Sequence, residues 1–328
     1  MSSQKSIASL SLDLDNKWSY LKIHGDPGWE DFPSYLDLVV PRILEFLTQR
    51  NLQITVFVVG QDAVLEKNQG ALMAISAGGH EIGNHSFSHE PWLHLYDKDR
   101  IEKEIAVTEE QITRLAGQRP VGFRGPGFSF SEETLKVLEQ RGYLYDASTW
   151  PTYLGPLARL YYFFNSNLGE QDRKRRRSLF GSVRNGLRPL KPYRWGKGGL
   201  LEIPVTTVPI FRAPIHLSYI VYLSTFSAAL ALGYFRAALA LCRVASISPS
   251  ILLHPLDFLG TDDNVGLDFF PGMRRRSAEK LRLAAEVLKI YSSEFNVVTL
   301  KQHAQWAGRE LETHLADGCV SDRAIIEK

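Results

Sequence analysis

The stretch SIASLSLDLD, residues 6–15, predicts a β-strand that ends in two carboxylates. Side chains at positions i and i+2 of a strand point to the same face, so Asp13 and Asp15 are expected to enter one pocket. Because aspartate is common at solvated strand ends, these two residues by themselves do not establish a site. Whether they form a site depends on which other residues the fold places beside them.

Strand and helix patterns alternate through much of the chain. The β-branched run LQITVFVVG (52–60) is typical of a buried parallel strand. Further strands are predicted at 80–85, 120–128, 143–149, 200–205, 248–257 and 295–300, and helices at 33–51, about 62–77, 98–117, 131–142 and about 274–292. Repeated strand–helix units predict an α/β fold, here a distorted (β/α) barrel of about seven parallel strands.

Residues 153–248 interrupt this alternation. We expect a single barrel domain over 1–310 with an insertion at 153–248, followed by a C-terminal tail at 311–328. The insertion contains an aromatic segment, RLYYFF (159–164), and a basic run, RKRRR (173–177).

Composition narrows the class of protein. The 328 residues are 44% hydrophobic, enough for a large core, and the formal net charge of +2 gives no overall field that would attract nucleic acid. Cys242 and Cys319 predict neither a disulfide framework nor a zinc cluster, and both suit a reducing compartment. Because the first fifteen residues contain no long apolar stretch, no secretory signal is predicted, and a cytoplasmic location is expected.

The segment HSFSH (85–89) places two histidines four residues apart, directly after a predicted short strand. This pair alone is a weak signal, since His85 and His89 are also compatible with a surface turn. Two imidazoles and an aspartate, however, form a suitable site for a divalent ion, for which zinc is the expected metal.

Two more polar residues lie at predicted strand ends. Arg124 either caps the carbonyl groups of a turn or lies beside Asp13 and keeps that carboxylate ionised. His254 is either a buried core histidine or a proton donor to a departing amine. The second role is open to it because the pKa of histidine in water is about 6.5. Parallel barrels gather their chemistry at the carboxyl ends of strands, where all these candidates lie.

The motifs SLDLD, HSFSH, RGPGF, YDASTW and LLHP, in that order, resemble the five motifs of the NodB-type polysaccharide deacetylase family. The resemblance covers roughly residues 7–150 and 245–300. It implies a distorted barrel of parallel strands that hydrolyses N- or O-acyl groups on sugars with a divalent metal.

The resemblance also implies residue roles. Asp13 would be the general base, Arg124 would orient it, His254 would be the general acid, and Asp146 would belong to the catalytic set through a loose match to the fourth motif. Asp15, His85 and His89 would bind the metal, Ser86 would steady the histidine loop, and Gly127, Phe128 and Trp150 would contact substrate.

The first motif has a spaced form, Asp-Leu-Asp, where the family usually has adjacent aspartates followed by glycine. This form resembles the branch that contains intracellular deformylases and cyclic-amide hydrolases. It leaves open how Asp13 and Asp15 divide the roles of base and metal ligand.

From Ala213 to Phe235 the sequence contains no Asp, Glu, Lys or Arg, over a length close to the roughly 20 residues that span a bilayer. A single crossing would separate His254 from Asp15 and the histidine pair. The segment is therefore predicted either to pack against the barrel or to lie in the membrane interface. The aromatic and basic runs of the insertion favour the interface, whereas ordinary core packing and a solvated loop are the simpler alternatives.

These features predict a metal-dependent hydrolase that removes an acetyl or formyl group from an amino sugar. The resemblance to the deformylase branch suggests a substrate carried on polyprenyl phosphate, in cell-envelope glycan biosynthesis at the inner face of the plasma membrane. The alternatives are a hydrolase of a soluble cyclic amide or oligosaccharide, and an inactive barrel that acts as a binding module. No nucleic-acid partner is expected.

Overall fold

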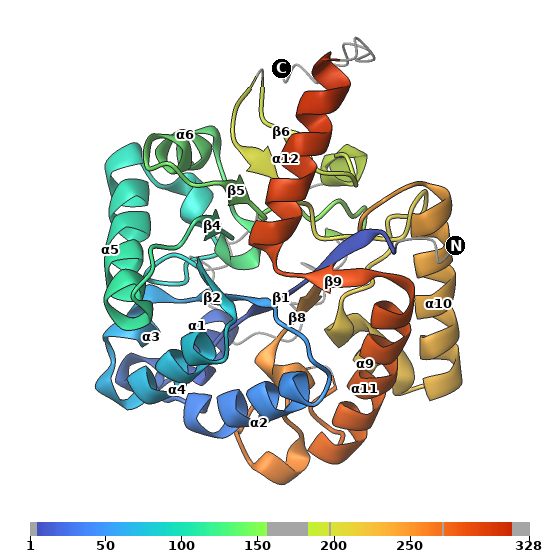
Figure 1. Cartoon of the computed structure of the whole chain (residues 1–328). Coiled ribbons are helices and arrows are strands. Elements are labelled where there is room, and N and C mark those ends of the chain that lie inside the picture. Colours follow the sequence, from blue (N-terminus) through green and yellow to red (C-terminus); the bar gives the residue numbers. More distant parts are fainter. Residues whose placement is uncertain (1–4, 156–182, 197, 271, 317–328) are drawn as a thin grey trace.

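A computed structural model describes residues 5–155, 183–196, 198–270 and 272–316 (Figure 1). The aromatic run at 159–164 and the basic run at 173–177 lie outside these residues, as does Cys319.

A curled, mostly parallel sheet forms the centre of the molecule, with helices around it (Figure 1). In the described residues the sheet has nine strands, in the order β6-β7-β5-β4-β3-β2-β1-β8, and β9 pairs with the start of β1. The strands are β1 (Ile7–Asp13), β2 (Thr55–Val58), β3 (Glu81–Asn84), β4 (Gly122–Phe123), β5 (Tyr145–Asp146), β6 (Tyr193–Arg194), β7 (Leu201–Glu202), β8 (Ser250–Leu253) and β9 (Asn296–Val298). Among these strands only the β6–β7 pairing is antiparallel.

The sheet curls until its two sides touch. Just beyond β7, the backbone N–H of Thr206 donates to the carbonyl of Ser250 at the start of β8 (3.0 Å), and the N–H of Ser250 donates to the Thr206 hydroxyl (2.8 Å). The predicted distorted α/β barrel is confirmed, with more strands than the seven or so expected.

The helices are α1 (Lys17–His24), α2 (Leu36–Thr48), α3 (Gly60–Val64), α4 (Glu66–Ala77), α5 (Lys98–Ala116), α6 (Glu132–Gln140), α9 (Leu217–Ser224), α10 (Ala228–Val244), α11 (Ser277–Glu294) and α12 (Leu300–Ala316). Ser131 caps α6 through its side chain, at the start of the helix predicted over 131–142. The single helix expected near 62–77 is two helices, because the backbone of Leu65 is extended between them.

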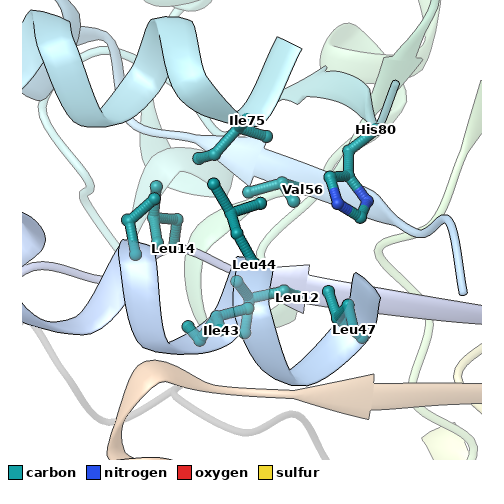
Figure 2. Close-up of a pocket in the computed structure, with 9 residues that line it drawn as sticks. Leu12, Leu14, Ile43, Leu44, Leu47, Val56, Ile75 and His80 are labelled. Carbon is teal, nitrogen blue, oxygen red and sulfur yellow. The ribbon is translucent and has the colours of Figure 1, made fainter. Parts of the chain in front are cut away.

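Alternation along β1 separates the core from the site. Leu12 and Leu14 lie on the helix-covered face, where they line a small apolar cavity with side chains of α2, α4 and β2 (Figure 2). Asp13, between them, lies on the other face and binds Arg124 inside the barrel. The side-chain period of a strand thus directs the carboxylates inward and the leucines outward. The cavity in Figure 2 therefore belongs to the core rather than to the site.

Helix α12 packs against the end of the barrel opposite the site, where it contacts side chains that point into the barrel. Its first turns share a hydrophobic cluster with β2, β5 and β7, formed by Phe57, Tyr145, Ala147, Leu201, Ile203, Leu300, Ala304 and Ala307. His303 Nδ1 lies 2.8 Å from Ser9 Oγ of β1. The tail boundary predicted at residue 310 falls inside α12, which continues to Ala316.

The charge-free segment forms two helices, α9 and α10, rather than one. Ser227 begins α10 by accepting a hydrogen bond from the backbone of Leu230, which divides the apolar run. Ile220 and Phe235 are fully buried in the main hydrophobic cluster, so one face of this pair packs on the barrel. Within the described ranges, no helix has the length and apolar character needed to cross a membrane.

Candidate active site

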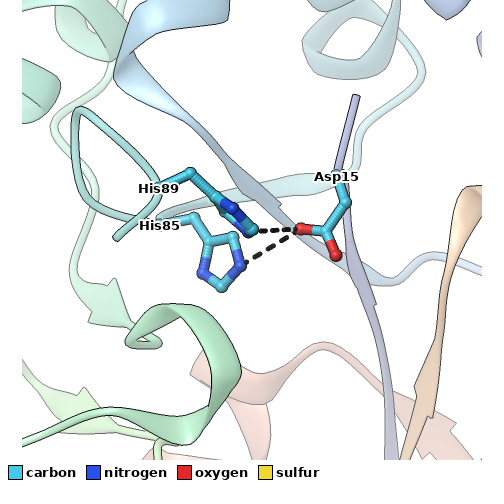
Figure 3. Close-up of side chains that lie close together, drawn as sticks. All are labelled: Asp15, His85 and His89. Carbon is cyan, nitrogen blue, oxygen red and sulfur yellow. Dashed lines mark hydrogen bonds and ion pairs between the residues drawn. The ribbon is translucent and has the colours of Figure 1, made fainter. Parts of the chain in front are cut away.

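Asp15, His85 and His89 meet beyond the carboxyl ends of β1 and β3 (Figure 3). His89 Nε2 lies 2.8 Å from Asp15 Oδ1, and His85 Nε2 lies 3.4 Å from the same oxygen. One ligand atom from each residue lies within 4.8 Å of the others, and both histidines are buried. The fold thus brings together the three side chains that the sequence nominated as metal ligands.

The hydrogen bonding of His85 fits a cation. Its Nδ1 lies 2.6 Å from the backbone carbonyl of Arg124, and a carbonyl can only accept, so Nδ1 carries the proton. In the neutral ring Nε2 is then a bare acceptor, and it faces the carboxylate of Asp15. Two acceptors that face each other repel unless a positive charge lies between them. A backbone carbonyl that fixes the tautomer of a ligating histidine is also a usual support in metal sites.

The electrostatics of the three residues point the same way. Burial by itself would raise the pKa of Asp15, but the neighbouring His89 and His85 outweigh it and hold that pKa well below the usual range. Burial would lower the pKa of His85, but Asp13 and Asp15 reverse this, so the pKa is raised. The pocket therefore favours an ionised carboxylate next to positive charge.

Glu104 of α5 holds the histidine loop in place. One carboxylate oxygen of Glu104 accepts from the backbone N–H groups of Phe87 (2.9 Å) and Ser88 (2.8 Å), and the other accepts from the Ser88 hydroxyl (2.8 Å). Ser86 was expected to steady this loop through the resemblance. Its hydroxyl, although buried, has no hydrogen-bond partner among the described residues, and its backbone takes a left-handed conformation (φ 59°).

Glu104→Ala is expected to weaken metal binding about 10- to 100-fold although every ligand remains, because the loop that carries the two histidines loses its anchor. Competition with a chelator for Zn²⁺ or Co²⁺ would measure the affinity, and circular dichroism would check the fold. Glu102→Ala, on the exposed face of the same helix, is the matched control. Equal affinity in the two variants would remove Glu104 from this role.

Asp13 and Arg124 form a buried ion pair beside the three ligands. Arg124 Nη1 lies 2.7 Å from Asp13 Oδ1 and donates to the Ser11 hydroxyl (2.9 Å), while Nε donates to the carbonyl of Ala147 (2.9 Å). The guanidinium lies 4.5 Å from the ring centroid of Phe57 and is fully buried. An arginine fixed from three sides holds the carboxylate in one orientation.

His254 follows β8 directly and lies next to Asp13 in the sheet. Leu12 of β1 pairs with Leu253 of β8, so the next residues along the two strands are Asp13 and His254. The backbone of His254 is still extended (φ −131°, ψ 157°), which places the two side chains on the same face. His254 Nδ1 lies 3.0 Å from the hydroxyl of Ser218 in α9.

Aromatic rings connect the RGPGF turn to His254. Phe128 stacks on Trp150 with 5.2 Å between centroids, Trp150 meets His216 edge to face at 5.7 Å, and the rings of His216 and His254 are 6.3 Å apart. Phe128 and Trp150, expected to contact substrate, therefore lie in one row with the expected proton donor. His216 was not expected from the sequence, where it appears only as a histidine before an apolar run.

Gly127 is the exposed residue of the turn Pro126–Phe128 and has φ 59°. A Cβ at this position would lie 3.1 Å from Cβ of Pro91, so both conformation and space favour glycine. Its expected contact with substrate through the backbone stays a prediction.

Asp146, which the fourth motif suggested for the catalytic set, is fully buried at the end of β5, and its catalytic role stays a prediction. It pairs directly with Glu202 of the neighbouring strand β7, and its Oδ1 accepts from the Ser148 hydroxyl (2.6 Å). Burial raises the pKa of Asp146 and also that of Glu202, so this carboxyl pair favours a shared proton. The Ser148 hydroxyl in turn accepts from the N–H of Gly125, which makes Asp146 a support for the turn after Arg124.

A second support lies behind Asp15 and was also missed. Asp62 Oδ1 accepts from Asn16 Nδ2 (2.7 Å) and Trp18 Nε1 (2.9 Å), and the Trp18 ring packs edge to face on His89 at 6.4 Å. The only sequence signal was the proximity of Asn16 and Trp18 to the first motif, because their partner Asp62 is far away along the chain.

Comparisons with known proteins agree with this geometry. Residues 26–145 match the profile of the family described as "Polysaccharide deacetylase". A peptidoglycan-N-acetylglucosamine deacetylase of Bacillus cereus is 36% identical over 104 residues, which are 32% of this chain and 37% of that protein. A peptidoglycan deacetylase of Helicobacter pylori is 28% identical over 149 residues, 43% of this chain and 49% of that protein. The chain thus spans half or less of the length of these relatives.

The fold is also that of a solved structure. A Mycobacterium smegmatis protein classed with the polysaccharide deacetylases matches with a TM-score of 0.58 and 21% identity, over 99% of each chain. The profile match covers His85, His89 and Arg124, and the structural match extends to the strands that carry Asp13, Asp15 and His254. Residues 26–145 therefore carry the polysaccharide deacetylase profile, and over this part of its length the chain is similar to members of that family.

Proposed function

We propose that this protein is a metal-dependent hydrolase that removes an N-acyl group from an amino sugar. The observation that carries the proposal is the meeting, at one end of the barrel, of the Asp15–His85–His89 group with the buried Asp13–Arg124 pair. His254 lies in register with Asp13 on the adjacent strand, which adds a proton donor of the right type.

Each residue has a chemical task in this proposal. Asp15, His85 and His89 hold a divalent ion, and zinc suits this ligand set, although other first-row metals do as well. Such an ion, when bound, polarises an acyl carbonyl and makes water acidic enough to react near neutral pH.

Proton transfer falls to two other residues. Arg124 holds Asp13 in one orientation, and Asp13 takes the proton of the attacking water. His254 gives a proton to the departing amine, and the Gly127 N–H is a candidate donor to the developing oxyanion.

Release of acetate or formate from a panel of N-acylated amino sugars tests the proposal. The panel would include N-acetylglucosamine oligomers, peptidoglycan fragments and amino sugars on polyprenyl phosphate, each with and without a chelator. Release that stops with chelator and returns with Zn²⁺, Co²⁺ or Mn²⁺ is the expected result. No release from any member, by protein that has bound metal, would contradict it.

The finer proposal is a lipid-linked substrate, with the acyl group acetyl or formyl. Tyr222 is 41% exposed and Phe226 is 70% exposed, and their rings meet edge to face at 5.6 Å. Leu230, at the start of α10, is 59% exposed. Helix α9 joins this apolar surface to the site, because Ser218 in its first turn lies 3.0 Å from His254 and the helix ends at Ser224, roughly 9 Å further along its axis. A substrate whose carrier stays in a membrane requires such a link.

Phe226→Ser is expected to reduce co-sedimentation with vesicles of phosphatidylglycerol and phosphatidylcholine several-fold, because it removes the most exposed ring of this surface. Neutralising Arg173–Arg177, or raising the salt concentration, is expected to reduce it too. Val244→Ser, 85% exposed at the far end of α10, is the matched control. Wild-type protein that does not sediment with vesicles would favour a soluble oligosaccharide or cyclic amide as substrate.

This proposal places the protein in the cytoplasm, at the inner face of the plasma membrane. Its support is the exposed apolar surface of α9 and α10 together with the basic run in the sequence. Fractionation of cells into soluble and membrane material, with a salt wash of the membranes, would test the placement.

A further inference from the structure

The side chain of His254 is held by a residue of the inserted segment rather than by the barrel. Ser218, in the first turn of α9, has its hydroxyl 3.0 Å from His254 Nδ1. The backbone N–H of His254 donates to Asp257 Oδ2 (2.8 Å), which bends the chain after β8 into the short turn Pro255–Asp257. His254 is therefore fixed at its backbone by Asp257 and at its ring by Ser218.

Asp257 is a buried acceptor next to both groups. It is only 2% exposed, and burial raises its pKa, while the charge of His254 and hydrogen bonds from His254 and Ser218 act against that rise. Lys280 of α11 is buried behind this turn and donates to the carbonyl of Leu256. The turn is thus held from both sides, by α9 and by α11.

The proton arrangement follows from these partners. A hydroxyl shared between a carboxylate and an imidazole donates its hydrogen to the carboxylate, which can only accept when ionised. The oxygen of Ser218 is then left to accept from Nδ1–H of His254. This arrangement leaves Nε2 as the nitrogen of His254 that exchanges protons with a substrate.

We propose that Ser218 is the positioning residue for His254: its hydroxyl keeps the proton on Nδ1, connects the ring to Asp257, and directs Nε2 to the leaving amine. The proposal rests on the proposed hydrolase function, since His254 is the proton donor assigned there. It makes the inserted helix α9 part of the catalytic machinery, because the barrel strands alone supply no partner for Nδ1 among the described residues.

The surroundings support the assignment to Ser218. The other titratable ring close to His254 is His216, whose pKa burial and the neighbouring His254 lower to about 3, so His216 stays neutral and does not compete as a charged partner. Asp257 lies beside His254 at this turn, Asp13 lies next to it in register on β1, and Lys280 lies on the far side of the turn. Ser218 is therefore the hydrogen-bond partner of His254 Nδ1 among the described residues.

Nuclear magnetic resonance of ¹⁵N-histidine-labelled protein tests the proposal without any substrate. The His254 signals, assigned by their loss in His254→Gln, are expected to show the neutral ring protonated on Nδ1. Ser218→Ala is expected to shift that equilibrium towards the Nε2-protonated form, and Ser218→Thr, which keeps a hydroxyl, to restore it. A ring protonated on Nε2 in the wild type, or no change in Ser218→Ala, would overturn the proposal.

Kinetics give the second measurement. Ser218→Ala is expected to lower kcat about 10-fold or more with little change in KM, and to change the pH dependence of kcat, because His254 loses the partner that orients its ring. Ser218→Thr should recover most of both, and Thr225→Ala, exposed beyond the end of α9, is the matched control.

The two measurements distinguish a failure of the positioning role of Ser218 from a failure of the hydrolase function. Unchanged kinetics in Ser218→Ala would contradict the positioning role. A wild-type protein without acyl release but with the expected tautomer would contradict the hydrolase function and leave the structural role of Ser218 in place.

Discussion

Asp13→Asn is expected to lower turnover of an N-acylated amino sugar by about 10²- to 10⁴-fold while the protein keeps its metal. The amide oxygen of asparagine can still accept the hydrogen bond from Arg124 that Asp13 accepts now (2.7 Å). The shape of the pair is therefore retained, and what disappears is the ability to take a proton.

The matched measurement compares metal content, thermal unfolding and acyl release in the same preparation. Asp37→Asn, on the exposed face of α2, controls for the loss of one surface carboxylate. If a metal-replete Asp13→Asn protein turns over normally, the base lies elsewhere, and Asp15 becomes the residue to test. If metal is lost together with turnover, Asp13 belongs to the ligand set, which the spaced first motif had left open.

His85→Ala should have the second large effect, a loss of metal affinity greater than the roughly 100-fold that removal of a supporting residue can cause. His85 supplies one of three ligand atoms, and its Nε2 faces Asp15 because the carbonyl of Arg124 fixes the other nitrogen. Without this imidazole, two side chains remain, and two are too few to hold a divalent ion firmly.

Metal content after gel filtration and the rise of Tm on addition of Zn²⁺ would measure the loss. A ligand that binds only the folded state raises Tm, so the wild type should respond to metal and His85→Ala should not. His80→Gln is the control, because His80 lies at the apolar cavity on the outer face of the sheet (Figure 2). A full metal content in His85→Ala would show that these three residues are not the metal site.

The local hydrophobic patterns of the sequence were enough to predict much of the fold and of the site. Asp13 and Asp15 share a face because the period of a strand is two, and the structure confirms Asp13 inside the barrel with Leu12 outside. The order of strands and helices predicted the barrel for a similar reason, since each element shows its own hydrophobic period. Residues at the ends of neighbouring strands then meet without any further information.

The supports of the site could not be predicted in this way. Glu104 reaches the histidine loop from the middle of a charged helix, and nothing in its neighbours along the chain distinguishes it from the exposed Glu102. Asp146 was expected in the catalytic set from a motif, and its pairing with Glu202, on a neighbouring strand far away in the sequence, could not be predicted. Such contacts are set by tertiary packing, which a single sequence does not display.

The seam between Thr206 and Ser250 has an evolutionary consequence. The chain leaves the barrel after Thr206 and returns at Ser250, and hydrogen bonds of 3.0 and 2.8 Å join these two points. What lies between them is an excursion whose length can change at small cost in loop-closure entropy, without altering the strand register. The segment between Thr206 and Ser250 can therefore be replaced by another in evolution, provided that the new segment supplies a partner for Nδ1 of His254.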